Sequence, residues 1–417
     1  MYKRQPGMMT SATIFLASAI LASSCLITPC RAEPANPFLD QILKDIAGNK
    51  LTEQKFGQLQ EYVQRDPKNS QAHICLGLAL DNLGLNDQAA IQFELAVRYG
   101  ADNPKALVEL CKEWIRLGHA PAAIAMLNEG LHKFPNDPEM LYLVGDFLLQ
   151  QKQRVNAQIV LKKAMDLDPN IPGLPTAYAA ALMEVNPSSA VGLASMDLQK
   201  NPRDDRALRV RGFSYRMLGE YEKAAKDLQI CFDRLPVLMG VAEALAECYY
   251  WMGDYAKAVR PAVFVTAFTC FPDVEQSGNI SKLLRVLRKL PKDKVVPLVS
   301  EVENEIAKHY TKPEFNYTLG KAYDDLEMHS AAMAEYKKAI AIDPKYVKPY
   351  YRLGIDQELF IRDYDAALQN YKMAHSLRPW DQEIDLAYMR LDDRLSNKKG
   401  DLAWKWKDWL RKTLNEN

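Results

Sequence analysis

Apolar residues recur at helical spacing along most of this 417-residue chain. The segment of residues 319–344, LGKAYDDLEMHSAAMAEYKKAIAIDP, reads as two helices joined by a short polar turn. Gly320, Ala332 and Pro344 stand twelve residues apart within it. Proline ends a helix because it lacks the amide hydrogen and disfavours helix in the residue before it. We therefore expect Gly320 and Ala332 to form the two sides of a close helix crossing and Pro344 to end the second helix.

The same twelve-residue spacing recurs along the chain. It is complete in two further segments: Gly145, Ala157 and Pro169, then Gly212, Ala224 and Pro236. Gly354 and Ala366 follow it with the proline one residue late. Most neighbouring units start 34 residues apart, and the starts are Ser70, Pro104, Pro138, Ile171, Asp205, Met239, Pro313 and Val347. A hairpin of this size cannot bury its own apolar face, so the period predicts units stacked on one another.

This period, with two helices per unit, resembles the tetratricopeptide repeat. The Leu-Gly pairs of the first helix and two further sets of positions match that family: Leu76-Gly77, Leu319-Gly320 and Leu353-Gly354; Tyr215, Tyr249 and Tyr323; Ala96, Ala164 and Ala339. The match extends over residues 36–379. The resemblance implies an all-α fold, a right-handed α-solenoid of helix-turn-helix units with a concave groove.

Departures from the period divide the chain. Residues 36–69 read as a degenerate first repeat or an N-terminal cap, and residues 70–272 as six repeats, of which those from Ile171 and Met239 are irregular. Residues 273–312 predict a nonstandard helical hairpin, with a hinge between two arrays as the alternative. Residues 313–380 hold two more repeats. Residues 381–417 predict capping helices, the last of which contains AWKWKDWLRK.

The first 32 residues differ from the rest of the chain. Positive charge in MYKR precedes an apolar run of small residues, TIFLASAILASSCLIT, and PCRA follows it. This pattern is typical of a signal peptide cleaved after Ala32, and it predicts export to the periplasm or the secreted space. A retained N-terminal anchor is the alternative, although the run is short for a membrane span. ASSC at residues 22–25 also resembles a lipobox, in which Cys25 would carry a lipid and tether the protein to a membrane.

Composition excludes several classes of function. Lys plus Arg and Asp plus Glu both number 53, so the chain lacks the net positive charge of a general nucleic-acid binder. Beyond the signal peptide the cysteines lack CxxC spacing, so we expect no zinc site and assign these residues to the core, with one disulfide left open: Cys75, Cys111, Cys231, Cys248 and Cys270. Phosphate-loop, HExxH and GxSxG motifs are missing, and the histidines are scattered. The sequence therefore predicts neither an enzyme nor a cofactor.

The family resemblance implies which residues line the groove. They belong to the first helix of each unit, at its second, fifth, ninth and twelfth places. In this chain they include Arg206, Arg209, Phe213 and Arg216; Gly240, Glu243, Glu247 and Tyr250; Tyr142, Asp146 and Leu149; Tyr317, Lys321 and Asp324. Guanidinium groups beside phenylalanine would suit an acidic or C-terminal carboxylate peptide. Alternatively, Arg209 and Arg216 pair with Glu243 and Glu247 on the neighbouring helix.

Together these features predict a non-enzymatic scaffold that binds a protein partner through its groove. The lysine and asparagine set with which some members of the family clamp chaperone peptides has no counterpart here. The first alternative is a lipid-anchored accessory subunit of an envelope assembly or secretion machine. The second is an enzyme with an unrecognised site.

Overall fold

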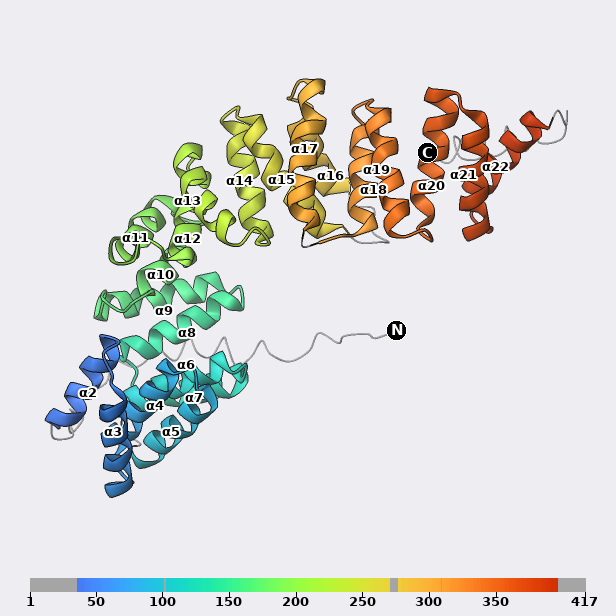
Figure 1. Cartoon of the computed structure of the whole chain (residues 1–417). Helices are drawn as coiled ribbons and strands as arrows, with labels where there is room; N and C mark the ends of the chain where they lie inside the picture. Colours follow the sequence, from blue (N-terminus) through green and yellow to red (C-terminus); the bar gives the residue numbers. More distant parts are fainter. Residues whose placement is uncertain (1–35, 101–102, 271–276, 309, 397–417) are drawn as a thin grey trace. The chain divides into compact units, whose positions relative to one another are not determined.

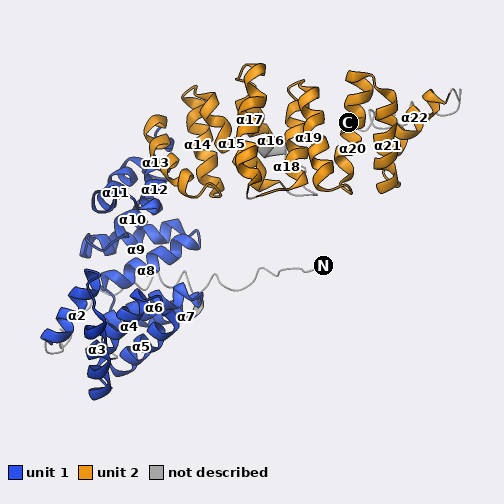
Figure 2. Ribbon diagram, viewed as in Figure 1, with its two compact units in different colours: residues 1–218 blue, residues 219–417 orange. Residues whose placement is uncertain are grey.

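In a computed structural model, residues 36–100, 103–270, 277–308 and 310–396 can be described, and every regular element among them is helical. The chain divides into two compact units, residues 1–218 and 219–417 (Figure 2). The division falls inside the repeat that starts at Asp205. The predicted signal peptide, the lipobox cysteine and the tryptophan-containing last helix lie outside the described residues.

Eleven helices are described in the first unit (Figure 1). They are α2 (Pro37–Ala47), α3 (Glu53–Arg65), α4 (Ser70–Asn82), α5 (Asn86–Tyr99), α6 (Pro104–Arg116), α7 (Ala120–Lys133), α8 (Pro138–Gln150), α9 (Arg154–Leu167), α10 (Leu174–Leu182), α11 (Pro187–Lys200) and α12 (Asp205–Met217). Consecutive helices pack as pairs, and side chains from α6 to α10 share one continuous core.

Ten α-helices and a short π-helix are described in the second unit. They are α13 (Tyr221–Arg234), α14 (Met239–Trp251), α15 (Tyr255–Thr269), α16 (Ser277–Leu287), α17 (Lys292–Ala307), α18 (Pro313–Asp324), α19 (His329–Ile342), α20 (Val347–Asp356), the π-helix η1 (Gln357–Ile361), α21 (Tyr364–Leu377) and α22 (Gln382–Leu395). The fold is therefore all-α, as the period predicts. We call the first helix of each repeat its A helix and the second its B helix.

Seven of the eight predicted repeat starts are the first residue of an A helix. The helices concerned are α4, α6, α8, α12, α14, α18 and α20. Polar side chains cap several helices: Asp137 accepts a hydrogen bond from the Met140 amide, and Asn186 accepts one from Ser189. The exception is the unit from Ile171, where Pro172 and Pro175 delay and shorten the A helix α10.

In four of the A helices described, the repeat glycine leaves room for a large side chain of the following B helix. A Cβ atom added to Gly320 would lie 2.4 Å from the ring of Tyr336, and one added to Gly77 would lie 2.5 Å from the ring of Phe93. Both rings stand sixteen residues after their glycine and are buried. The atoms nearest to Gly320 belong to Tyr336, one turn after Ala332 on α19, and the predicted contact of Gly320 with Ala332 itself stays a prediction. Ala332 is fully buried, but the glycine accommodates the aromatic ring.

A left-handed residue ends the A helices and turns the chain into the B helices. In four repeats the residue seven positions after the repeat glycine position is a glycine with positive φ: Gly84, Gly118, Gly219 and Gly253. In the repeat from Pro138 the same position is Lys152, with φ 61°. The amide that follows donates to the carbonyl five residues before it, as from Gln153 to Leu148 and from His119 to Trp114. This is the Schellman arrangement, which satisfies carbonyls at the helix end.

An extra residue sits at the end of the last A helix. Here η1 extends α20, the left-handed residue is Arg362, and the closing bond from Asp363 spans six residues to Gln357. The inserted residue moves the following helix by one position. Ala367, not Ala366 as the twelve-residue spacing predicts, is the fully buried alanine of this repeat. A π-turn is the usual way in which a helix accommodates one added residue.

The irregular hairpin is tied to its neighbours on both sides. Both α16 and α17 pack against α15, and Arg260 of α15 makes two hydrogen bonds with Glu305 of α17, of 3.0 and 2.8 Å. On the other side, the buried Asn316 of α18 donates to Glu303 of α17 at 2.7 Å and to Glu335 of α19 at 2.8 Å. The alternation of packed helices therefore continues through this segment.

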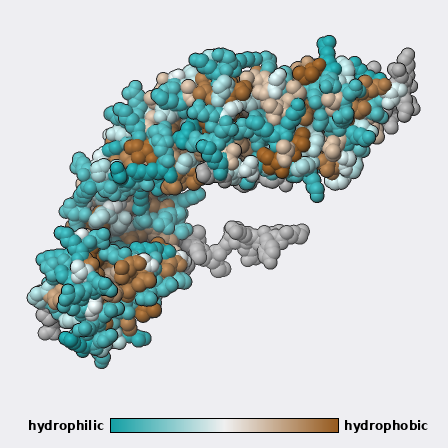
Figure 3. Space-filling model, viewed as in Figure 1, coloured by the Kyte–Doolittle hydropathy of each residue, from teal (hydrophilic) through white to brown (hydrophobic). Residues whose placement is uncertain are grey.

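The five cysteines within the described residues are free and buried, and burial raises the pKa of the Cys75 and Cys111 thiols to about 12. Cys111 stands at a glycine position, with its Sγ 3.6 Å from the carbonyl oxygen of Ala123. On the face shown in Figure 3, hydrophilic residues predominate and apolar residues form small groups. None of the helices described combines the length and apolarity needed to cross a bilayer.

Candidate functional site

The first unit brings three of the predicted groove residues together. Arg206 of α12 forms an ion pair with Asp146 of α8, although sixty residues separate them in the sequence. Tyr142, one helical turn before Asp146, lies against the left-handed Gly173, so that a Cβ atom there would be 2.8 Å from the tyrosine hydroxyl. Burial and the Asp146 charge raise the pKa of Tyr142. The A helices α8 and α12 thus present a shared polar surface, which we call the α8–α12 surface.

The other members of the arginine stripe extend along α12. Arg209 is half-buried and its Nε donates to the Asp205 carbonyl at 3.3 Å, while Phe213 and Arg216 follow at intervals of about one turn, also half-buried. Glu243 and Glu247 belong to the other compact unit. Their predicted pairing with Arg209 and Arg216 stays a prediction.

In the second unit, a hollow of about 190 Å³ lies between α14, α15 and α16. Glu243 and Glu247 line it together with Lys282 and Arg285 of α16. Glu243 pairs with Lys282 at 3.1 Å, and the Arg285 guanidinium lies 4.4 Å from the centre of the Tyr250 ring. The repeat register could not identify the two basic residues, because α16 belongs to the hairpin where the period fails.

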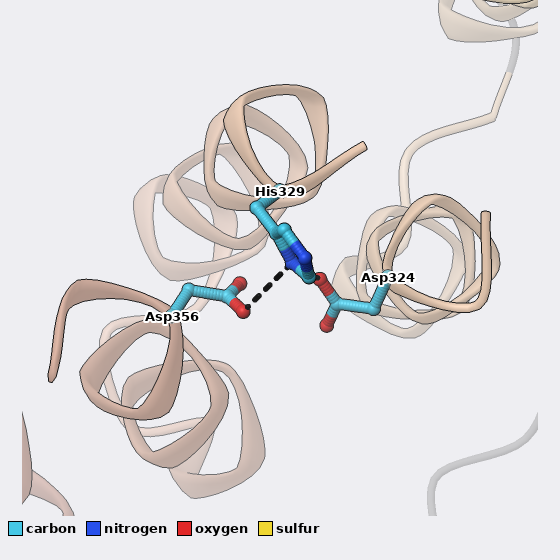
Figure 4. A group of neighbouring side chains, drawn as sticks. All are labelled: Asp324, His329 and Asp356. Atoms are coloured by element: carbon cyan, nitrogen blue, oxygen red, sulfur yellow. Dashed lines mark hydrogen bonds and ion pairs between the residues drawn. The ribbon is translucent and has the colours of Figure 1, made fainter. Parts of the chain in front are cut away.

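Three side chains that the sequence does not group converge near the end of the array (Figure 4). Asp324 ends α18, His329 begins α19 and Asp356 ends α20. The His329 Nδ1 atom lies 3.4 Å from Asp324 Oδ1 and 3.5 Å from Asp356 Oδ1, and one ligand atom from each residue lies within 4.8 Å of the others. We call this group the Asp-His-Asp cluster.

Rigid neighbours hold the cluster in position. The buried Tyr336 hydroxyl donates to Asp324 Oδ2 at 2.6 Å, which leaves Oδ1 facing His329. The Phe360 ring, carried by η1, stacks on the imidazole with centroids 3.4 Å apart and planes inclined by 12°. Tyr317, a predicted groove residue, packs against Tyr336 with ring centroids 5.8 Å apart. Lys321, also predicted, is half-exposed on the same helix.

Asp356 is the most perturbed member of the cluster. Its side chain is 3% exposed, and Oδ2 has no hydrogen-bond partner. Burial and the neighbouring Asp324 charge raise the pKa of Asp356 to about 8, although Arg352 opposes the shift. Asp356 stands two residues after the repeat glycine position, where three other repeats bury Ala79, Cys248 and Ala322 and the repeat from Pro104 buries Glu113. A carboxylate at this buried register position is a signal that the sequence offers, but it marks Glu113 as well as Asp356, and among the described residues only Asp356 joins a three-ligand group.

Two family models match parts of this chain. A tetratricopeptide-repeat model matches residues 115–170, which contain α8 and α9, and a TPR-repeat model matches residues 320–355. Both lie where the predicted register and the helix pairs agree. Two separate segments of the chain therefore match tetratricopeptide-repeat models, in agreement with the repeated helix pairs of the fold.

Several solved structures are similar to this chain. One is MamA from Desulfovibrio magneticus RS-1, 23% identical, covering 40% of this chain and 94% of that one with a TM-score of 0.34. A second is a tetratricopeptide repeat protein from Parabacteroides merdae, 14% identical, covering 69% and 98% with a TM-score of 0.37. A third is PilW, described as a type IV pilus biogenesis factor, 17% identical, covering 52% and 98% with a TM-score of 0.39. No curated protein matches the chain.

Proposed function

We propose that this protein is an exported scaffold that binds a protein partner along the A-helix residues of its repeats. The observation that carries the proposal is the α8–α12 surface. Arg206 of α12 is sixty residues from Asp146 of α8, and the two side chains pair although the repeat that starts at Ile171 separates their repeats in the sequence. Such a surface can bind an extended peptide over more than one repeat.

The chemistry of this surface favours an acidic segment in the partner. Arg209 and Arg216 extend it along α12, and a guanidinium group can donate two parallel hydrogen bonds to one carboxylate. Phe213 lies between them in the sequence and supplies an apolar contact. Arg209 and Arg216 are the arginines proposed to contact the partner, because they continue the stripe along α12 beyond the Arg206–Asp146 pair.

A double charge reversal tests this proposal. The proteins that crosslink to the chain in its native compartment are identified first, and binding of the captured partner is then measured with purified proteins. Arg209→Glu with Arg216→Glu should weaken that binding more than tenfold while the helical circular dichroism stays unchanged. Arg65→Glu with Arg98→Glu, on α3 and α5, is the matched control, since both residues are exposed and lie on helices that are not A helices. Equal binding by the two double variants would contradict the proposal.

The compartment is a separate part of the proposal. The charged and apolar pattern of residues 1–32 supports export, with cleavage after Ala32. Mass determination of the mature protein from its native cells should give an N-terminus at Glu33. A lipid-anchored form is the alternative; it predicts palmitate labelling that is lost in Cys25→Ser and a protein that fractionates with membranes.

A further inference from the structure

We propose that Asp324, His329 and Asp356 bind one divalent transition-metal ion of the zinc class. The proposal goes beyond the scaffold function and does not depend on it. The ligand set has one imidazole and two carboxylates, which is a combination that zinc accepts. In Figure 4 the three side chains point toward one another from three helices.

The distances suit such an ion. Ligand atoms around a tetrahedral zinc stand about 3.3–3.4 Å apart when the bonds are about 2.0–2.1 Å. The His329 nitrogen is 3.4 Å from one carboxylate oxygen and 3.5 Å from the other. The two carboxylates approach within 4.8 Å, so rotation about their side-chain bonds can close the third edge. Three protein ligands leave a fourth position for water or for a partner's side chain.

An unsatisfied buried carboxylate is the independent sign that the group binds a ligand. Asp356 Oδ2 is buried without a hydrogen-bond partner, in a side chain that is 3% exposed and faces the other two residues. A buried unpaired carboxylate is costly, and a bound cation would satisfy it. The repeat fold alone does not require a carboxylate here, since Ala79 and Ala322 fill the equivalent place in two other repeats. Glu113 fills it in a third repeat and also leaves Oε1 without a hydrogen-bond partner, but its other oxygen pairs with Arg116 at 2.9 Å.

The surroundings resemble the supporting shell of metal sites. Metal-binding carboxylates and imidazoles are usually oriented by a second layer of contacts. Here Tyr336 orients Asp324 through its hydroxyl, and Phe360 restricts the rotation of the His329 ring. Asp324 and His329 are about one-fifth exposed, which lets an ion reach the cluster from solvent.

The test uses the full chain without a histidine tag. The protein is stripped with a chelator, dialysed, and titrated with Zn²⁺ by calorimetry and with Co²⁺ by visible absorption, which reports tetrahedral coordination. We expect one ion per chain and a melting temperature that rises by about 5 °C or more at a hundredfold excess of Zn²⁺ over Kd.

Variants locate the ion. His329→Gln and Asp356→Asn should each weaken Zn²⁺ binding by more than about tenfold. Loss of a residue that only orients a metal ligand already lowers metal affinity by about 10–100-fold, so loss of a ligand should lower it at least as much. His375→Gln should bind as the unaltered chain does. His375 is a matched control because its Nδ1 lies 3.4 Å from Asp385 and its ring stacks on Tyr388, but the pair is not part of a three-ligand group.

Circular dichroism confirms folding for each variant. If Asp356→Asn does not fold, His329→Gln alone decides, because this residue is partly exposed at the start of its helix. The proposal is wrong if the unaltered chain binds none of Zn²⁺, Co²⁺ and Ni²⁺ up to millimolar concentration. It is also wrong if His329→Gln binds as tightly as His375→Gln.

Discussion

Glycine and aromatic residues form the smallest unit of this architecture. Gly77, Gly320 and Gly354 each face a ring from the B helix of their own repeat: Phe93, Tyr336 and Tyr371. Glycine within a helix costs about 1 kcal/mol relative to alanine. Contact with a buried ring must outweigh that cost, because a methyl group would displace the ring.

Two glycines in the first unit should respond to alanine with opposite signs. Gly77→Ala should lower the free energy of unfolding by about 1–3 kcal/mol, since the added Cβ would overlap the Phe93 ring. Gly57→Ala, inside α3, should raise it by up to about 1 kcal/mol, because nothing lies within 4 Å of the new atom. Chemical denaturation of both variants measures the difference. Two changes of the same sign would refute the role assigned to the Gly77 contact.

At the scale of elements, the turns and the irregular hairpin decide how repeats connect. Positive φ at the end of an A helix is supplied by glycine in four repeats and by Lys152, Glu327 and Arg362 in three. The backbone bond that closes the turn is retained with lysine and glutamate, at Gln153 and Met328. Arg362 follows the one-residue insertion, where the closing bond is longer. Turn geometry is thus preserved although the residue type varies.

Asn316 fastens the irregular hairpin to the next repeat. It separates two buried carboxylates, and burial holds the pKa of Glu335 above its ordinary value although the Lys338 ammonium and the Asn316 amide oppose that shift. Asn316→Ala should lower the free energy of unfolding by about 1–3 kcal/mol at pH 7, since buried acceptors lose their donor.

The pH dependence of that loss has a defined sign. A carboxyl whose pKa is raised in the folded state stabilises the fold less as the pH rises above its ordinary pKa. The Asn316 amide stabilises the ionised form of Glu335, so its loss matters less once Glu335 is protonated. The loss of stability caused by Asn316→Ala should therefore shrink as the pH falls toward 4.5, the ordinary pKa of glutamate. Lys292→Ala, on α17 of the irregular hairpin, is the control, because its pair with Glu327 is exposed and should contribute little. A loss from Asn316→Ala that grows toward acid would contradict this explanation.

At the scale of the whole molecule, the repeat at each end of an array has a neighbour on one side only. Its other apolar face is exposed to solvent unless a capping helix packs on it. Within the described residues α22 follows the last repeat, and its Ala387 and Leu391 pack with Ala367 and Tyr371 of α21. Removal of α22 would expose this apolar face, and terminal repeats need a polar outer face for solubility.

Truncation tests the cap. A chain that ends at Pro379 should form soluble aggregates, which light scattering after size exclusion detects at equal protein concentration. A chain that ends at Ser396 retains α22 and separates its contribution from that of residues 397–417. If the chain ending at Pro379 stays monodisperse, α22 is not needed as a cap.

Much of the fold was predictable because the signals are local. Prolines and polar caps begin helices at positions such as Pro104, Pro138 and Pro187, and their effect depends on neighbours within one helical turn. The glycine period predicted the repeat register for the same reason. It did not identify Tyr336 as the nearest neighbour of Gly320, because spacing along the chain does not say which side chain of the facing helix fills the gap.

The candidate sites were predictable only in part. The groove residues Tyr142, Asp146 and Arg206 stand at the places of the A helix that the family resemblance assigns to the groove, so the repeat pattern already related them. Their ion pair required the actual rotation of α8 and α12. Lys282 and Arg285 lie on α16, where the 34-residue period fails, so the repeat pattern could not predict that they line the hollow.

The chain's own pattern of small, apolar and helix-ending residues specifies its repeats and where nearly every A helix begins, because helix formation responds to residues within a few positions. The Asp-His-Asp cluster depends instead on side chains from three helices that span 33 residues, from Asp324 to Asp356. Their convergence follows from how α18, α19 and α20 rotate against one another, and Phe360 reaches His329 from the π-turn of the inserted residue. These are properties of packing between helices, which no single stretch of sequence contains.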